Sequence, residues 1–304
     1  MKKQAPFVVK SISEQHNALS LAKPDHPLVG IFKIDDINFE KLYKEAPMLT
    51  MDLYSITLKK NVNGKVRYGQ GYYDYDGGVL SFMAPKQIIS NGCEDYQPTG
   101  WCISFHPDFI RRHPLAKKIK EYNFFSYSVN EALHLSEKEE EAIVSIIKLM
   151  QQELQSSIDA FSENVLISYL ELLLNYADRF YNRQFITRKG VSHDLLTRME
   201  QLLHAYFDSG ESLQHRYPSV ELLASQLNLS AGYLSDMLRS LTGQNAQQHI
   251  HNHVIEKAKE MLSSTTLSVS EIAYQFGFEY PQSFNKLFKN KTNQTPLQYR
   301  QSFN

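Results

Sequence analysis

The spacing of hydrophobic residues changes once along the chain, near residue 106. Before that point, short runs of β-branched and aromatic residues occur at 30–34, 51–59, 66–73, 79–83 and 100–105. Turn residues such as Asn63-Gly64 and Gly77-Gly78 separate them. Runs of this length, bounded by turns, are typical of antiparallel strands. The sequence therefore predicts an antiparallel β-domain over about residues 28–106.

After residue 107 the apolar residues recur at helical spacing. Ser136 and Glu139 fit a capping box, and the apolar positions that follow return every three or four residues up to Leu154. A second helix is predicted at 161–181, with apolar residues around nearly its whole circumference, so more than one face must be covered. We expect a second copy of the chain to supply part of that cover. Residues 183–191 contain three basic residues and a glycine and predict a linker.

The segment from residue 192 to 304 contains two related units about fifty residues apart. The residues that match are Ser219, Ala224, Asn228, Leu229, Leu234, Leu238 and Gly243 in the first, and Ser268, Ala273, Gly277, Phe278, Phe284, Phe288 and Asn293 in the second. Each unit predicts a capped helix, a tight turn and a second helix that ends at a left-handed residue. The units are predicted at 219–242 and 268–292.

A spacer helix is predicted between the two units. Apolar residues from Ile250 to Leu262 recur at helical spacing, and a helix of about eighteen residues is ~27 Å long. Two units held roughly one DNA turn apart would enter successive major grooves on one face of the duplex. One chain would then read a site in two parts.

The C-terminal segment resembles the AraC/XylS family of bacterial transcription regulators. The most specific match lies in residues 268–300, through Phe276-Gly277-Phe278, Ser283-Phe284, Phe288-Lys289, Thr295-Pro296 and Tyr299-Arg300. The first unit matches through Leu223-Ala224, Tyr233-Leu234 and Thr242-Gly243. The resemblance implies an α+β protein of two domains, with an all-α tandem helix-turn-helix domain at 192–304.

For residues 1–182, the resemblance implies a cupin-like antiparallel β-barrel followed by helices, which would bind a small-molecule effector and form a homodimer through residues 161–181. Activation of transcription, with RNA polymerase as a partner, is the commoner output in that family. A second interpretation is a ligand-independent regulator whose N-terminal domain serves only dimerisation or partner binding. A cupin enzyme with a DNA-binding tail is disfavoured, because the paired histidines and glutamate of metal cupins are missing.

Charge supports DNA binding only locally. The chain has 32 Lys and Arg against 33 Asp and Glu, for a formal net charge of -1. No acidic residue follows Glu279, whereas four basic residues do: Lys286, Lys289, Lys291 and Arg300. Because cations near phosphates supply most non-specific affinity, the second unit is expected to dominate binding.

Residues that contact DNA are expected on the exposed face of the second helix of each unit. The second unit offers Gln282, Ser283, Asn285, Lys286, Lys289 and Lys291. The first unit offers Tyr233, Ser235, Asp236 and Arg239. This unit departs from the family's pattern, because Asp236 replaces a basic or amide residue and Val254 in the spacer replaces an arginine. Weak phosphate contact is therefore expected from the first unit.

An effector pocket is predicted from aromatic residues of the β-domain, because aromatic walls and phenolic donors suit small-molecule sites. The candidates are Tyr54, Tyr68, Tyr73, Phe82 and Trp101. The same residues would equally serve as core and surface of the β-domain.

The sequence predicts no catalytic residues, metal site or cofactor. Cys93 and Cys102 have no metal-ligand spacing and fit reduced thiols of the cytosol. His249 and His253 would share one face of a helix, but the sequence offers no third metal ligand at a fixed spacing from them. These two residues and His251 are therefore expected on an exposed polar face. The chain start has no apolar run of a signal peptide, and Glu171 interrupts the most apolar segment. We therefore expect a soluble, cytoplasmic protein without membrane contact.

Overall fold

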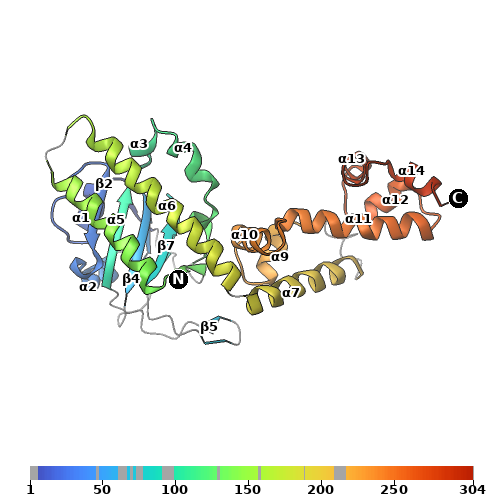
Figure 1. Ribbon diagram of the computed structural model, residues 1–304, viewed down its shortest axis with the longest axis horizontal. Helices are drawn as coiled ribbons and strands as arrows, with labels where there is room; N and C mark the ends of the chain where they lie inside the picture. The colour runs from blue at the N-terminus through green and yellow to red at the C-terminus, as the bar shows by residue number, and fades with distance from the viewer. Residues whose placement is uncertain are drawn as a thin grey trace. The chain divides into compact units, whose positions relative to one another are not determined.

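The computed structural model describes residues 6–45, 48–60, 67–68, 71–72, 78–90, 99–128, 131–156, 159–187, 189–208 and 217–303. The chain divides into two compact units, Met1–Gln184 and Phe185–Asn304, shown in Figure 1. None of the helices in the described ranges is long and apolar enough to cross a membrane.

The N-terminal unit is built on an antiparallel sheet of five strands. Their order is β10-β7-β4-β9-β2, where β2 is Val29–Lys33, β4 Tyr54–Lys60, β7 Val79–Met83, β9 Thr99–Phe105 and β10 Leu133–His134. A second sheet has the order β1-β3-β8, with β1 at Phe7–Val9, β3 at Met48–Met51 and β8 at Ile88–Ser90. A third sheet consists of β5 (Arg67–Tyr68) paired antiparallel with β6 (Gly71–Tyr72).

The five-stranded sheet and the β5–β6 pair are antiparallel as predicted, whereas β1 pairs with β3 in parallel, and the cupin-like barrel is not confirmed. In the described part of the chain the strands form three separate sheets, and none of them closes on itself. The predicted strands at 30–34, 79–83 and 100–105 match β2, β7 and β9 closely. The turn at 63–64 and Gly77 lie outside the described residues.

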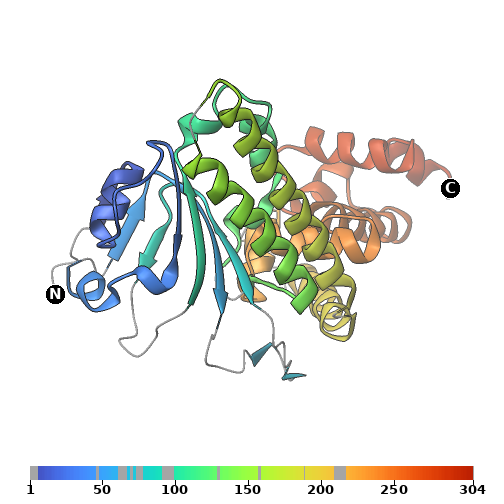
Figure 2. The same ribbon diagram turned by 60° about the vertical axis from the view of Figure 1, so that its left-hand side comes forward.

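Side chains alternate along each strand, so the two faces of the large sheet differ. One face is mainly apolar, whereas the other, called the polar face below, carries buried serines beside Phe32 and Cys102. Ser55 lies opposite Ser104, whereas the next residue, Ile56, lies opposite Ile103. Figure 2 shows α1 (Ile12–Ala18) and α2 (Phe39–Glu45) on one side of this sheet, and α5 (Glu137–Gln155) and α6 (Ser162–Thr187) on the other. Gln15 of α1 donates a 2.8 Å hydrogen bond to Ser104, so the polar face is the one under α1.

Of the aromatic residues predicted to line a pocket, Phe82 is buried in the core of the apolar face, whereas Tyr54 and Trp101 are half-buried on the same face. Tyr54 stacks on Phe105 at 5.1 Å between ring centroids, and Phe82 packs against Phe124 at 4.4 Å. Trp101 lies opposite Leu58 on the same face. Strand alternation directs Tyr54 and Phe82 towards the covering helices, and their part in an effector pocket stays a prediction. Tyr73 lies outside the described residues, as does the side chain of Tyr68.

Short helices connect the sheet to α5 and α6. They are α3 (Pro107–Ile110), α4 (Leu115–Lys118) and the 3-10 turns η2 (Ile119–Glu121) and η3 (Asn123–Ser126); η1 (Ile34–Asp36) follows β2. The capping box predicted from Ser136 and Glu139 is present at the start of α5. The apolar positions of α5 are buried as predicted, including Ile143, Ile147 and Met150.

The linker predicted at 183–191 is largely helical. α6 continues to Thr187, and α7 (Lys189–Asp208) begins two residues later. Arg183 forms a bidentate ion pair with Glu139, at 2.7 and 3.0 Å, and Gln184 is fully buried. These contacts fix Arg183 and Gln184 within α6. The boundary between the two compact units, after Gln184, therefore falls inside this helix.

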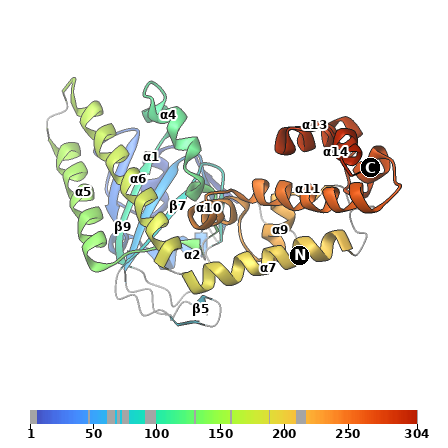
Figure 3. The same ribbon diagram turned by 45° about the vertical axis from the view of Figure 1, so that its right-hand side comes forward.

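The C-terminal unit consists of helices. After α7 come α9 (Val220–Gln226), α10 (Ala231–Thr242), α11 (Ala246–Ser264), α12 (Val269–Gln275), α13 (Pro281–Thr292) and α14 (Pro296–Gln301). In Figure 3, α11 runs as the central rod of this unit, with α7 along one side and α13 and α14 on the other. The predicted spacer helix and the two helix pairs around it are therefore confirmed as elements.

Candidate nucleic-acid interface

The second helix-turn-helix unit is formed by α12, a tight turn and α13. Ser268 and Glu271 cap α12 reciprocally, and the Ser268 N–H, at 2.7 Å, holds the pKa of the Glu271 carboxyl below its usual range. Gly277 follows α12 with φ of 77°, and the Phe278 N–H then bonds back to the Ala273 carbonyl at 3.1 Å. The left-handed glycine turns the chain so that α13 crosses α12.

The first unit repeats this turn with different residues. Asn228 takes the left-handed conformation, with φ of 57°, at the position of Gly277. The Leu229 N–H bonds to the Ala224 carbonyl at 2.9 Å, as Phe278 does to Ala273 in the second unit. Asparagine tolerates this conformation better than most residues with a Cβ, so both units keep one geometry.

The repeat also includes the start of the helix that follows each unit, which the sequence analysis missed. Gly243 and Asn293 both end their helices in the left-handed region, with φ of 76° and 61°. Thr242 and Thr292 each bond, at 2.8 Å, to the carbonyl four residues earlier. The caps that follow also correspond, because α11 and α14 both begin with a capping box closed by glutamine. The sequence signal was the pair Thr242-Gly243-Gln244 and Thr292-Asn293-Gln294.

The helix α11 contacts α10 of the first helix-turn-helix unit and α12 and α13 of the second. It has 19 residues, which corresponds to about 28 Å. Its buried residues Val254 and Ala258 pack with Phe284 and Phe288 of α13. Val254 is fully buried, so this position contributes packing in this chain and offers no phosphate contact.

The predicted reading face of α13 is exposed to solvent. Phe284 and Phe288 point inward and are fully buried. The polar residues before, between and after these two phenylalanines are exposed: Gln282, Ser283, Asn285, Lys286 and Lys289. A helix with aromatic anchors on one side and amides and ammonium groups on the other presents donors and acceptors suited to base edges and phosphates.

Two of the four predicted basic residues have structural partners. The Lys291 Nζ donates to Asn252 Oδ1 of α11 at 2.9 Å, which ties the end of α13 to the central helix. The Arg300 Nε donates to the carbonyl of Leu262 at 3.1 Å, and its Nη2 is buried. Lys291 is nevertheless exposed, so the exposed cationic charge of this segment lies at Lys286, Lys289 and Lys291.

The first unit presents a weaker face. Tyr233, expected at the surface, is 4% exposed, and its ring meets the edge of Phe185 at 5.2 Å. Within α10, the Arg239 Nη1 lies 3.0 Å from the Asp236 Oδ1 and forms an ion pair with it. Ser235 is half-buried. Arg239 is the exposed one of the four candidates. The ion pair partly neutralises the carboxylate that the sequence identified as unfavourable for DNA.

A groove that sequence reasoning missed runs beside α13. Its volume is about 640 Å³, and its lining includes Gln247 and His251 of α11 and Lys286 and Asn290 of α13. Tyr280, at the start of α13, is 63% exposed. Burial lowers the pKa of His251, and the charge of Lys291 lowers it further. The sequence feature that could have indicated this groove is Tyr280, an aromatic residue directly before Pro281.

The three histidines of α11 are half-buried rather than on an exposed face. The His249 Nε2 lies 2.8 Å from the hydroxyl of Thr242, and the His253 ring meets His204 edge-on at 4.4 Å. Within the described ranges, no group of three or more metal-ligating side chains is positioned to hold a metal ion.

Comparison with known proteins finds similarity in the segment that contains the two helix-turn-helix units. Residues 223–302 match the family described as "Helix-turn-helix domain". The Msm operon regulatory protein of Streptococcus mutans is 26% identical over 255 residues, which cover 82% of this chain and 84% of that protein. The C-terminal domain of the two-component response regulator yesN from Fusobacterium nucleatum matches with 34% identity and a TM-score of 0.29, covering 33% of this chain and 96% of that one.

A third relative is much longer than this chain. Histidine kinase P4 of Formosa agariphila is 27% identical over 135 residues, or 44% of this chain. The chain spans 10% of that protein's length. The similarity to the kinase therefore concerns a small part of it.

Proposed function

Because the C-terminal unit of this chain is a helix-turn-helix domain of the AraC type, we propose that the whole protein is a sequence-specific DNA-binding regulator of transcription. The observation that carries the proposal is the exposed face of α13, where Gln282, Asn285 and Lys286 lie beside fully buried aromatic anchors. Amides and a lysine at the start of a helix after a tight turn are suited to the major groove.

The second unit supplies most of the affinity in this proposal. Lys286 and Lys289 are exposed, whereas Asp236 and Arg239 of the first unit neutralise each other. The length of α11, about 28 Å, agrees with binding in successive major grooves. The first unit then contributes register and selectivity more than electrostatic attraction.

On the basis of the family resemblance, we further propose that the N-terminal unit binds a small-molecule effector. In this proposal the protein activates transcription, with RNA polymerase as its partner. The polar face of its sheet supports a ligand-responsive role, because Ser55, Ser104 and Gln15 are buried there. The alternative is a ligand-independent regulator whose N-terminal unit serves only dimerisation or partner binding. A ligand changes the output only if it binds one conformation more tightly than the other.

A homodimer forms through α6 in this proposal. Phe161, just before that helix, is 71% exposed and Leu172 is 43% exposed, whereas Leu173 and Leu174 are fully buried inside the unit. Leu172→Glu is expected to convert a dimer to a monomer in light scattering at micromolar concentration. A wild-type monomer under those conditions would exclude the dimer.

The test of the main proposal is selection of genomic DNA fragments by the full chain, followed by anisotropy titrations of a selected fragment across a salt series. We expect one enriched sequence motif and an affinity that falls steeply as salt rises. No enrichment over bulk DNA, or affinity independent of salt, would refute DNA-binding regulation.

A further inference from the structure

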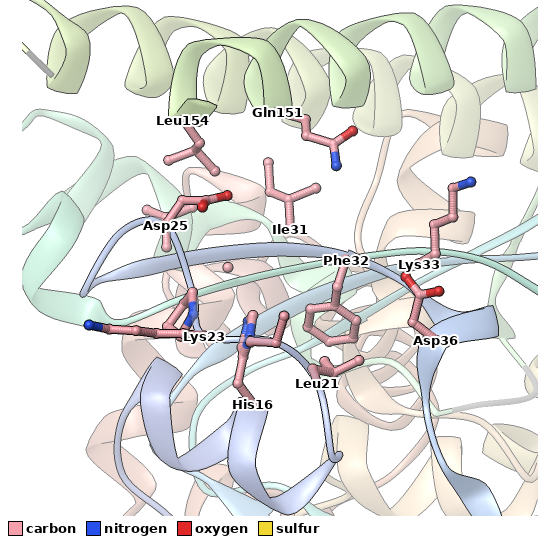
Figure 4. A pocket seen from close by; sticks show the side chains of 14 residues that line it. His16, Leu21, Lys23, Asp25, Ile31, Phe32, Lys33, Asp36, Gln151 and Leu154 are labelled. Atoms are coloured by element: carbon pink, nitrogen blue, oxygen red, sulfur yellow. The ribbon is translucent and has the colours of Figure 1, made fainter. Parts of the chain in front are cut away.

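A cavity of about 440 Å³ lies beside the edge strand β2 of the large sheet, and its lining includes His16 of α1 and Gln151 and Leu154 of α5. Figure 4 shows the side chains of Gln151 and Leu154 directed from α5 towards the strand. The Nε2 atom of His16 is buried beside Gly30. The formal charges of the two lysines and two aspartates in the lining cancel. The lining therefore selects no class of ligand.

The groove beside α13 differs from this cavity, because part of the predicted reading face lines it. Ser283 and Lys286 line the groove and are exposed. Tyr280, the residue before Pro281, lines it as well. Residues 280, 283 and 286 follow one another at intervals of three, so Tyr280 continues the stripe of α13 that carries Ser283 and Lys286. Tyr280 therefore lies at the N-terminal end of the reading face.

The side chain of Tyr280 does not cap α13. Tyr280 is the N-cap residue of this helix, and its side chain makes no capping hydrogen bond in the described structure. The corresponding residue of α10 is Ser230, whose hydroxyl accepts a hydrogen bond from the Tyr233 N–H at 3.2 Å. Serine, threonine, asparagine and aspartate are preferred at this position because their side-chain oxygens accept such bonds. Tyrosine at residue 280 thus lacks a contact that would stabilise the start of the helix.

The ring of Tyr280 also lies outside the core. The core cluster of this region contains Phe276, Phe284 and Phe288, all buried, and Tyr280 is not part of it. The residue is 63% exposed. Aromatic side chains stabilise a fold mainly through the large area that they bury. Because Tyr280 supplies neither a cap nor a core contact in the described structure, its ring is available to a partner of the reading face.

One feature of DNA matches an exposed aromatic ring at this place. In the major groove thymine presents a 5-methyl group, which apolar side chains read by direct contact. The N-terminal residues of a recognition helix are the ones that contact base edges. Glu279, directly before Tyr280, is exposed, and its carboxylate repels phosphates. This end of α13 therefore favours contact with a base over contact with the DNA backbone.

We propose that Tyr280 is a specificity-determining residue of the second helix-turn-helix unit, and that its ring reads the 5-methyl group of a thymine in the major groove. Such a contact requires a specific DNA site, so it rests on the proposed function. Removing the methyl group from that thymine should weaken binding about fourfold, the factor expected for one buried methyl group.

Deoxyuridine tests the contact, because it lacks only the 5-methyl group of thymine. In a DNA fragment selected by the full chain, each thymine is replaced singly by deoxyuridine, and the affinity is measured by anisotropy. The wild-type chain is expected to lose affinity about fourfold at one thymine of the site. Tyr280→Phe keeps the ring and should show the same loss. Tyr280→Ser should bind the thymine and deoxyuridine fragments equally at that position.

Three results would overturn the proposal. One is a wild-type chain that loses no affinity at any thymine. Another is a Tyr280→Ser variant that discriminates between thymine and deoxyuridine as the wild type does. The third is a loss of discrimination in Tyr280→Phe, which would assign the contact to the phenol hydroxyl.

Tyr280→Ser also tests whether the ring serves the fold. Because serine caps α10 at the corresponding position, the variant should unfold at an unchanged or higher temperature than the wild type. A lower unfolding temperature would show that the ring stabilises the fold, which would remove the reason for assigning it to DNA.

Tyr274→Ser is the matched control, because Tyr274 of α12 is also an exposed tyrosine, at 52%. This variant should keep the thymine discrimination of the wild type. Its loss in Tyr274→Ser as well would refute a specific role for Tyr280.

The same measurements separate this contact from the proposed function. A wild-type chain that selects a DNA motif, with the same deoxyuridine profile in Tyr280→Ser, would leave DNA-binding regulation standing and refute the contact. No enriched motif for the wild-type chain would refute the regulatory function itself, and the contact with it.

Discussion

Asp236 and Arg239 form an ion pair of 3.0 Å one turn apart on α10, the second helix of the first helix-turn-helix unit. The pair reduces the electrostatic effect of both residues on approaching DNA. Asp236→Asn removes a negative charge and leaves Arg239 available to a phosphate, so DNA affinity should rise. The plot of log affinity against log salt concentration should become steeper by about one released counterion. Anisotropy titrations at several salt concentrations measure both.

Glu141→Gln is the matched control for Asp236→Asn, because Glu141 is an exposed acid of α5 in the other unit. It should leave DNA affinity unchanged. Weaker DNA binding by Asp236→Asn would show that the carboxylate itself reads a base, such as cytosine N4.

Lys286→Ala should weaken DNA binding by about 1–3 kcal/mol, because Lys286 is exposed on the reading face of α13. The same titrations measure the loss. Lys138→Ala, an exposed lysine at the start of α5, is the control for the loss of one positive charge. Equal losses in both variants would mean that charge alone matters and that α13 has no special role.

Arg300→Ala should lower stability and leave the salt slope of DNA binding unchanged. Its Nε donates to the Leu262 carbonyl, so the substitution removes a charge-assisted hydrogen bond between α14 and α11, worth about 1.5–3 kcal/mol. Circular dichroism of urea unfolding measures the stability. A reduced salt slope with normal stability would assign Arg300 to phosphate contact instead.

Gly243→Ala should destabilise the C-terminal unit by ~1–2 kcal/mol through backbone strain alone. Its φ is 76°, and an added Cβ would meet nothing within 4 Å. Gly243→Asn should cost less, since Asn293 takes the same conformation at the equivalent place. Hydrogen exchange of α10 amides ranks the variants, and an alanine variant as stable as wild type would contradict the argument.

The stability of the C-terminal unit should fall as pH drops below about 6.5, the ordinary pKa of histidine. Burial lowers the folded-state pKa of His249 and of His251. In this window the unfolded chain binds more protons than the folded one, so acid favours unfolding. Thermal unfolding between pH 7 and 5 should show a smaller decline in His249→Gln/His251→Gln than in wild type.

Sequence patterns determined the local structure of the two helix-turn-helix units and of the spacer helix, but not the helices α7 and α14 on either side of them. Ser219, Ser268, Gly243 and Asn293 act through their own backbone and its nearest turns, so the ends of the helices could be placed from residue types alone. The inward and outward faces of α13 followed from its 3.6-residue period, which separates Phe284 and Phe288 from the polar positions.

Tertiary structure decided which side chains are available and which are used for packing. Tyr233 is buried by Phe185, Lys291 is held by Asn252, and Arg300 by Leu262, all partners that lie at least 38 residues away. Strand alternation predicts that Tyr54 and Ser55 face opposite ways, but which face the helices cover depends on the packing of α5 and α6. For the same reason the cavity at His16 could not be predicted, because α1, β2 and α5 meet only in the folded chain.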